Sequence, residues 1–294
     1  MIPLRNVVCL AAIAASGLAS GPASAELTAP RISPKATVSQ TLGMTDVTLV
    51  YSRPGVRGRT IWGELVPYGK PWRTGANEAT TFTCSTDITV NGQKLPAGTY
   101  SFFTIPAQAE WTVVFNKQKD LWGAFTYDST QDQLRVTARP EPAPYQEWMD
   151  FAFQDLAPAE LPRSPGSGKL VLHWEKLSVP IAIETDMVER TLAAAHAEMS
   201  SLKADDWRTP MRAASFCHDQ DVNLVEAMQW AQKSAAIQEN YQTLSVVAKL
   251  QAKRGRTQDA IATAKKAIKI GKASKDRVDT SATEKLLAEW TAKK

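Results

Sequence analysis

The stretch Tyr51–Thr80 combines cationic and aromatic side chains in a pattern that suits ligand binding. Between Ser52 and Glu78 it carries five cations and two anions, which are Arg53, Arg57, Arg59, Lys70, Arg73, Glu64 and Glu78. Trp62, Tyr68 and Trp72 are interleaved with them. Guanidinium groups bind carboxylate or phosphate through paired hydrogen bonds, and indole faces stack on sugars, aromatic rings or guanidinium groups. The pattern therefore predicts a cleft for a small anionic or glycan-like ligand.

Seven residues of this segment are the candidate ligand contacts. They are Arg53, Arg59, Trp62, Trp72, Arg73, Asn77 and Glu78. A second interpretation is architectural: the three arginines pair with Glu64, Glu78 or loop carbonyls and pack on the two indoles. Long loops need such internal polar ties because their backbone groups lack sheet partners. Both interpretations stay open from the sequence.

An enzyme would need a proton donor, a base or a nucleophile. Glu78 is the best-placed carboxylate, but a neighbouring arginine lowers a carboxyl pKa, so a base or a ligand-orienting group suits it better than an acid. No pair of histidines or cysteines has metal-ligand spacing, and we expect neither a metal site nor a cofactor. The chain has no nucleophile elbow, dinucleotide fingerprint or phosphate loop.

The elements that would position this segment are strands. From Thr37 to Ile183 the apolar residues alternate with a period of two, and turn residues recur between them. The expected strands are Thr37–Leu42, Asp46–Tyr51, Thr80–Cys84, Asp87–Val90, Thr99–Ile105, Trp111–Asn116, Gln133–Ala138, Trp148–Gln154, Lys169–Glu175 and Val179–Glu184. Asn91-Gly92 predicts a hairpin turn because both residues tolerate positive φ, and Pro158–Gly168 is expected to be a loop. This pattern predicts an antiparallel β-sandwich or jelly-roll-like domain over residues 26–185.

After Thr185 the apolar period changes to about 3.6 and alanine becomes abundant, which predicts a small all-α domain over residues 186–294. The alanines at 260, 264 and 267 follow Gly255 and resemble a tetratricopeptide unit, and a degraded copy precedes them by 33 residues. Gln251 and Lys272 depart from that pattern, so a plain helical bundle is the alternative. Lys249–Arg277 holds ten cations and two acids, which fits either a solvated surface or attraction to anionic lipids or an acidic protein.

The N-terminus has the pattern of a secretory signal peptide. Arg5 precedes an apolar stretch, and Ala23-Ser24-Ala25 forms a small-residue cleavage site before Glu26. Cleavage of residues 1–25 would leave a chain with no transmembrane segment and a net charge of +3, in a periplasm or outside the cell. That charge is too small to indicate a nucleic-acid partner. We expect Cys84 and Cys217 to be small buried residues, and the alternative is a disulfide that would join the two halves of the chain.

The string from Tyr51 to Thr80, together with Ser33-Pro34, Gly43 and the segment from Pro96 to Tyr100, resembles the bacterial domain-of-unknown-function family 2911. The resemblance covers about residues 30–185 and implies an exported setting. It implies no activity, substrate or catalytic residue.

Three functions follow from these observations. The favoured one is a non-catalytic binding protein, whose β domain holds a small ligand and whose helical domain docks a partner protein. The alternatives are a cell-envelope enzyme that uses Glu78 and nearby arginines, and a purely structural scaffold.

Overall fold

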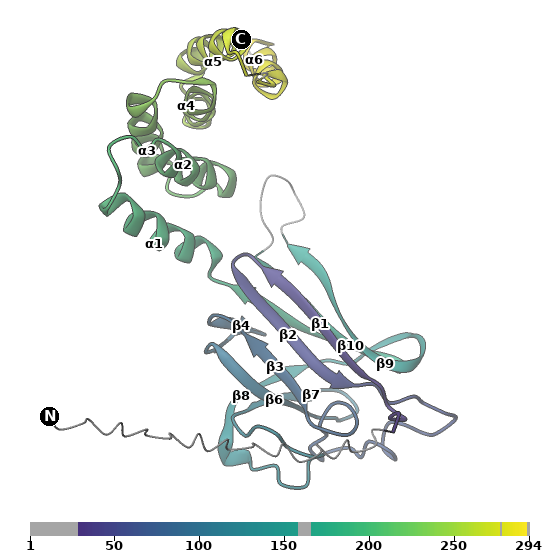
Figure 1. The fold of residues 1–294 in the computed structure, drawn as a ribbon. Coiled ribbons are helices and arrows are strands. Elements are labelled where there is room, and N and C mark those ends of the chain that lie inside the picture. The colour runs from purple at the N-terminus through teal and green to yellow at the C-terminus, as the bar shows by residue number, and fades with distance from the viewer. Residues whose placement is uncertain (1–28, 158–165, 277, 293–294) are drawn as a thin grey trace, which may run out of the picture. The chain divides into compact units, whose positions relative to one another are not determined.

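The computed structural model describes residues 29–157, 166–276 and 278–292, and its first part is built of ten strands in two antiparallel sheets. The signal-peptide pattern and most of the expected Pro158–Gly168 loop lie outside these residues. The six-stranded sheet has the order β1-β2-β3-β6-β7-β8, and the four-stranded sheet has the order β5-β4-β10-β9 (Figure 1). The expected β fold followed by helices is confirmed.

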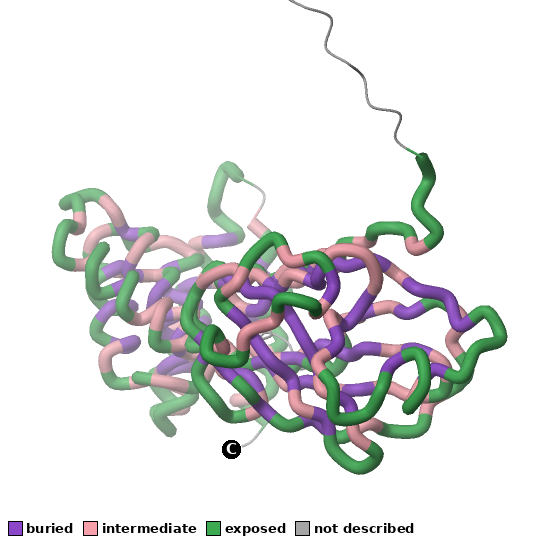
Figure 2. Tube along the Cα trace, turned by 90° about the horizontal axis from the view of Figure 1, so that it is seen from below, coloured by how far each residue is buried: buried purple, intermediate pink, exposed green. Residues whose placement is uncertain are grey.

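The strands divide between the two sheets as follows. The six-stranded sheet contains β1 (Lys35–Leu42), β2 (Thr45–Ser52), β3 (Thr80–Cys84), β6 (Gly98–Ile105), β7 (Trp111–Asn116) and β8 (Asp132–Ala138). The four-stranded sheet contains β4 (Ile88–Val90), β5 (Gln93–Leu95), β9 (Glu141–Ala157) and β10 (Ser167–Thr185). One core lies between the sheets, because Phe82, Phe102 and Phe115 of one and Leu172 and Trp174 of the other belong to the same buried cluster. Figure 2 shows buried residues along the strands and exposed residues in the connections.

Three strand predictions need correction. The strand expected at Trp148–Gln154 is longer at both ends and runs from Glu141 to Ala157 as β9, whose first half shows no apolar alternation. The two strands expected at Lys169–Glu175 and Val179–Glu184 form one strand, β10, whose pairing with β9 is irregular around Glu175. Glu175 has φ +55, as in a bulge, so the polar residues that suggested a break only bend the strand. The short β5 was not expected as a strand, although its hairpin turn was. Asn91 and Gly92 have φ +44 and +81 and join β4 to β5.

The second part is helical. Its helices are α1 (Met187–Ser200), α2 (Arg208–Gln220), α3 (Leu224–Ile237), α4 (Tyr241–Lys253), α5 (Thr257–Ala273) and α6 (Ser281–Ala292). The starts of α2 and α4 are 33 residues apart, and so are those of α3 and α5. Ala260, Ala264 and Ala267 are fully buried, as Ala227 is in the earlier helix, because small residues let paired helices approach closely. The 33-residue spacing of the alanine pattern in the sequence is therefore also the spacing between the two helix pairs α2–α3 and α4–α5.

Candidate functional site

Trp62 and Trp72 lie with other indoles in the core between the sheets. The Trp72 ring stacks on Trp174 with centroids 5.8 Å apart, and its Nε1 donates to the Gly75 carbonyl at 3.1 Å. The Trp62 ring meets those of Trp72, Trp111 and Trp174 edge-on at 5.0 to 6.0 Å. Trp72 is only 9% exposed. These two candidate contacts stabilise the core, and neither lines the pocket described below.

Arg53 and Arg59 donate mainly to backbone carbonyls. Arg53 Nε donates to the Met149 carbonyl at 2.7 Å, and its Nη2 lies 3.7 Å from the Asp150 carboxylate. Arg59 donates to the carbonyls of Gly55 and Val56 at 2.6 and 3.1 Å. Arg53 thus ties the start of the segment to β9, and Arg59 closes a turn within the segment. Both arginines therefore bind backbone carbonyls, as the architectural interpretation of the segment expects.

Arg73 is placed differently from these two arginines. It is half-buried, and its Nε is buried without a hydrogen-bond partner. Burial lowers the pKa of the guanidinium, and no carboxylate pairs with it among the residues that the structure describes. Neither the expected pairing with Glu64 nor that with Glu78 is present there.

Asn77 and Glu78 lie where the segment meets the connection between β7 and β8. Asn77 has φ +59, and its Nδ2 donates to the Ser33 carbonyl at 3.1 Å. Its carbonyl accepts from Gly123 N at 3.2 Å, and Ala79 N donates to the Leu121 carbonyl at 2.8 Å. These bonds form a short antiparallel bridge between Glu78 and Trp122.

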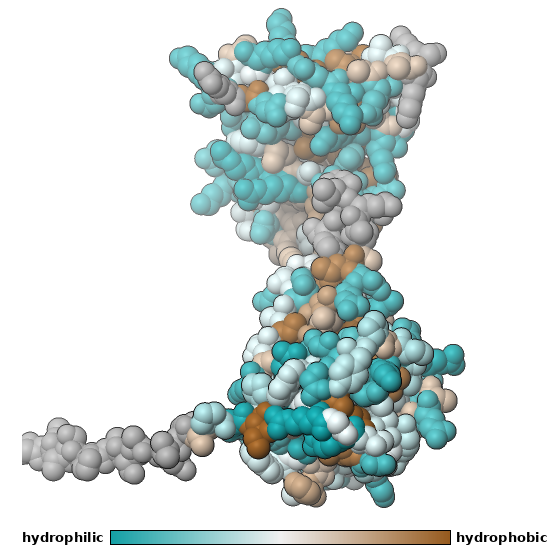
Figure 3. Space-filling model, turned by 90° about the vertical axis from the view of Figure 1, so that its right-hand side faces the viewer, coloured by the Kyte–Doolittle hydropathy of each residue, from teal (hydrophilic) through white to brown (hydrophobic). Residues whose placement is uncertain are grey.

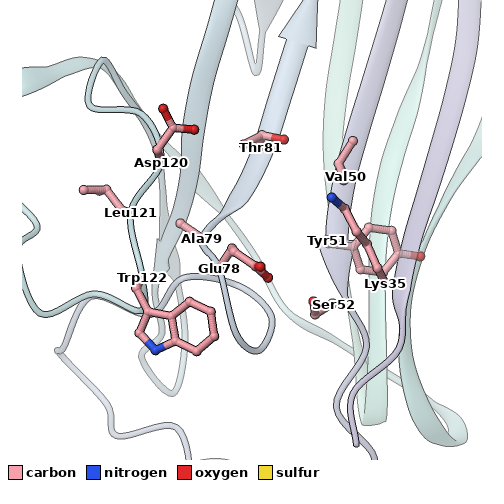
Figure 4. A pocket seen from close by; sticks show the side chains of 10 residues that line it. All are labelled: Lys35, Val50, Tyr51, Ser52, Glu78, Ala79, Thr81, Asp120, Leu121 and Trp122. Carbon is pink, nitrogen blue, oxygen red and sulfur yellow. The ribbon is translucent and has the colours of Figure 1, made fainter. Parts of the chain in front are cut away.

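A pocket lies beside this bridge, on the outer face of the six-stranded sheet. Its lining residues come from β1, β2, β3 and the two bridged segments, and are Lys35, Val50, Tyr51, Ser52, Glu78, Ala79, Thr81, Asp120, Leu121 and Trp122 (Figure 4). The outer face is identified by alternation, since Leu49, Tyr51 and Phe82 belong to the core and their neighbours Val50 and Thr81 point the other way. The cavity volume is about 240 Å³, which suits a ligand of about one ring.

The connection 117–131 is held by a polar network. Asp132 accepts from Tyr127 Oη at 2.7 Å, from Arg135 Nε at 2.6 Å and from Asn116 Nδ2 at 2.7 Å. Burial and the hydrogen bond to Asp132 raise the pKa of Tyr127 to about 12. The tyrosine therefore remains a neutral donor at ordinary pH and holds the end of the connection.

A small second core supports the middle of the same connection. Phe103 and Val114 are fully buried on the outer face of the sheet, and Leu121 and Tyr127 pack against them with Ala124. Trp122, next to Leu121, is by contrast 58% exposed. The anchored neighbours thus present an open indole on a supported backbone, and binding sites in loops require such support.

The polar chemistry of the pocket is that of two carboxylates, one ammonium group and hydroxyls. The side chains of Glu78 and Asp120 can accept hydrogen bonds, that of Lys35 can donate them, and that of Thr81 can do both. In Figure 4 the Glu78 carboxylate faces the space between the Trp122 indole and the side of Lys35. Within the described ranges no cluster of three metal-ligating side chains occurs. The arrangement can bind a small polar molecule against an aromatic face.

Of the seven candidate contacts, only Glu78 lines this pocket. Sequence reasoning missed Lys35, Asp120 and Trp122. The available signal was the length of the connection between the expected strands Trp111–Asn116 and Gln133–Ala138, because long connections in compact domains are often functional. Nothing in the sequence showed that this connection returns to Glu78.

Two other properties of the chain bear on its class. Cys84 and Cys217 are buried and unpaired, as expected, and burial raises the pKa of the Cys217 thiol to about 11. In the part of the chain that the structure describes, no helix is long and apolar enough to cross a membrane.

Comparison with known proteins returns one family. The family described as "Protein of unknown function (DUF2911)" matches residues 33–183, which confirms the resemblance found in the sequence. No curated protein and no solved structure gives a significant match.

Proposed function

We propose that this chain, which belongs to the DUF2911 family, is an exported, non-catalytic binding protein. Its β part takes a small polar ligand in the pocket beside Trp122, and its helical part docks a partner protein. The N-terminal pattern, with Ala23-Ser24-Ala25 before Glu26, supports export to a periplasm or beyond.

The observation that carries the proposal is the exposed indole of Trp122 inside a lined cavity. Large aromatic side chains offer much apolar area, and a ligand that covers one removes that area from water. Here the indole belongs to a connection anchored by Tyr127 and Leu121, and the Glu78 side chain lies on one side of it (Figure 4). A ligand that covers the indole would gain the free energy of this burial without ordering the backbone.

The site favours binding over catalysis. A catalytic use of Glu78 with nearby arginines requires those groups in one cavity, and no arginine lines the pocket. The companion carboxylate considered in the sequence, Glu64, is exposed and does not line it either. The pocket lining combines Glu78 and Asp120 with one lysine and hydroxyl groups, which suits recognition of a polar molecule.

The helical part supports the docking half of the proposal. Two helix pairs with a 33-residue offset and buried small residues are typical of tetratricopeptide-like arrays, which bind proteins through their exposed surfaces. Some cations of this part are paired, as Lys266 is with Glu239 at 2.6 Å and Lys272 with Glu284 at 2.8 Å. Hydrophilic residues cover much of this part in the view of Figure 3, with pale and hydrophobic residues between them. We expect a partner with a polar, acidic surface.

The ligand-binding half is tested by thermal stabilisation of the full chain with a library of envelope glycans and small metabolites. A ligand should raise the melting temperature of the wild type and leave that of Trp122→Ala unchanged, because a ligand stabilises only a folded protein that binds it. The matched control is Trp148→Ala, which removes a 37% exposed indole on β9 outside the pocket and should keep the response. A library with no hit, or hits that survive Trp122→Ala, would contradict the proposal.

A further inference from the structure

We propose that the free edge of β1 is a dimerisation surface, at which β1 pairs antiparallel with β1 of a second copy of this chain. The pairing would join two six-stranded sheets into one continuous sheet around a two-fold axis at Val38. This inference is independent of the proposed ligand pocket and of the helical docking surface. It depends on the exposure of the edge, on the direction of its backbone groups and on the charges near its two ends.

β1 is a long sheet edge without the usual protection. It has eight residues and lies at one end of the six-stranded sheet, and within the described residues β2 is its only strand partner (Figure 1). Edge strands of soluble proteins usually carry prolines, bulges, inward-pointing charges or a covering segment, because their unpaired N–H and C=O groups accept further strands. β1 has no proline, pairs with β2 without a bulge, and has Lys35 as its only charged residue.

The other three sheet edges, β5, β8 and β9, are short or covered. β5 has only three residues, and Asn91 Nδ2, from the turn before it, donates to the Thr137 carbonyl of β8 at 2.7 Å. β9 contains prolines in its first half, and in its middle Met149 N donates to the Pro54 carbonyl at 3.0 Å. Among the described strands, β1 is therefore the edge that a further strand can extend.

The alternation of backbone groups along β1 shows which of them reach the free edge. Arg53 N donates to the Pro34 carbonyl at 2.8 Å, one position before β1 begins. Because hydrogen-bonded and non-hydrogen-bonded pairs alternate in an antiparallel ladder, the even-numbered residues of β1 bond to β2. The residues whose N–H and C=O groups point to the free edge are therefore Lys35, Thr37, Ser39 and Thr41. Of these groups, only the Thr41 carbonyl accepts another bond from a described residue, from Gln40 Nε2 at 3.0 Å.

One register of two antiparallel copies uses all of these groups. With Val38 on the two-fold axis, Lys35 lies opposite Thr41 of the second copy, and Thr37 lies opposite Ser39 of the second copy. Each of these pairs, and its symmetry mate, can exchange both backbone hydrogen bonds. An axis at either neighbouring residue would leave Lys35 or Thr41 without a partner in β1. Val38 packs against the core while only partly buried, so contact between the two valines would also remove apolar area from water.

The charges near the two ends of β1 favour a second copy over an unrelated peptide. Lys35 is exposed at one end, and Asp46 is exposed beside the other end, where its carboxylate accepts from Thr41 Oγ1 at 2.7 Å. Neither charge forms an ion pair with a described residue. In the proposed register Lys35 faces Thr41 of the second copy, so its long side chain can reach Asp46 of the second copy. The two-fold axis repeats this attraction at the other end.

The first experiment measures the molar mass of the full chain by size-exclusion chromatography with light scattering over a concentration series. We expect the wild type to form a dimer. Thr37→Pro removes an N–H group that β2 does not use, and edge strands tolerate proline at such a position. This variant should be a monomer with the far-UV circular dichroism of the wild type. Thr37→Ala, the matched control, loses the same side chain but keeps the N–H group and should remain a dimer.

Cysteine substitutions test the register. Val38→Cys places two thiols in a non-hydrogen-bonded pair across the axis, with Cα atoms about 4.5 Å apart, a separation that a disulfide can bridge. Mild oxidation should therefore give a covalent dimer on a non-reducing gel. Thr41→Cys, the control on the same strand, places its two thiols at opposite ends of the paired strands and should give no covalent dimer. The native Cys84 and Cys217 are buried and should not compete.

Three results would overturn the inference. The first is a wild type that is monomeric at every concentration, and the second is a folded Thr37→Pro variant that remains a dimer, because its interface would then lie elsewhere. The third is equal cross-linking of Val38→Cys and Thr41→Cys, or cross-linking of neither. If Thr37→Pro does not fold, the cross-linking comparison decides. The ligand pocket is tested separately, by the Trp122-dependent thermal shift.

Discussion

Replacement of Arg73 by methionine tests whether this arginine stabilises the fold. The guanidinium is half-buried, its Nε has no hydrogen-bond partner, and no carboxylate pairs with it among the described residues. Methionine keeps an unbranched stem of similar length and removes the charge. We therefore expect Arg73→Met to fold with unchanged or slightly increased stability.

The magnitude follows from what the substitution removes. A buried donor without a partner costs about 1–3 kcal/mol. Because Arg73 is only half-buried and water reaches part of the group, the gain should stay between zero and about 1 kcal/mol. For a chain of this size that gain raises the melting temperature by at most about 2–4 °C.

The assay is urea and thermal unfolding of the full chain, with Arg53→Met as the matched control. Arg53 donates to the Met149 carbonyl at 2.7 Å and lies near Asp150, so its loss should cost about 1–2 kcal/mol. A loss of about 3–5 kcal/mol in Arg73→Met, partly restored by Glu78→Gln in the double variant, would refute the reasoning. That result would show that Arg73 and Glu78 form a stabilising pair in solution.

Four further predictions concern the core, the pocket connection and the ends of the domains. Trp72→Ala should lose about 3–5 kcal/mol in urea unfolding because it leaves a cavity between the sheets, and a loss below about 1 kcal/mol would contradict the core assignment. The raised pKa of Tyr127, about 12, means that the unfolded chain ionises first, so stability should fall as pH rises from about 10 toward 12. In Tyr127→Phe the free energy of unfolding should fall less over this pH range. The same fall with pH in both proteins would argue against the role of Tyr127. Residues 26–185 should fold when expressed alone and resist proteolysis, and an unfolded fragment would indicate a core shared with the helices. The exported protein should begin at Glu26 in an intact-mass measurement, whereas a retained Met1 would disprove cleavage.

Local patterns in the sequence predicted most of the strands. β3 and β7 have the expected bounds, since each is a short β-branched or aromatic run with turn residues on both sides. Asn91-Gly92 predicted its hairpin for the same local reason. The continuity of β10 through Glu175 could not be read from the sequence, because a bulge and a turn both interrupt the alternation with polar residues. The short β5, with two exposed polar residues, carried no apolar alternation.

The site was less predictable because composition does not determine the direction of a side chain. Trp62 and Trp72 suited a ligand platform by type, yet both belong to a cluster of indoles between the sheets. Arginines suited an anion by type, yet Arg59 donates to carbonyls within its own turn. The pocket joins Lys35, Glu78 and Asp120, which are far apart in the chain and meet only through sheet pairing and one bridge. No local spacing connects them.

The segment Tyr51–Thr80 therefore contributes both to the core and to the pocket. Trp72 fixes it to the core, and six residues later Glu78 forms part of the pocket. Under the proposed binding function, a substitution at Trp72 should weaken ligand binding through loss of folding, whereas one at Trp122 should weaken it with the fold intact. We therefore expect different effects from the two substitutions: Trp72→Ala should lower the stability of the fold, and Trp122→Ala should lower the affinity for a ligand. A binding defect in this segment identifies a ligand contact only when the unfolding curve of the same variant is unchanged.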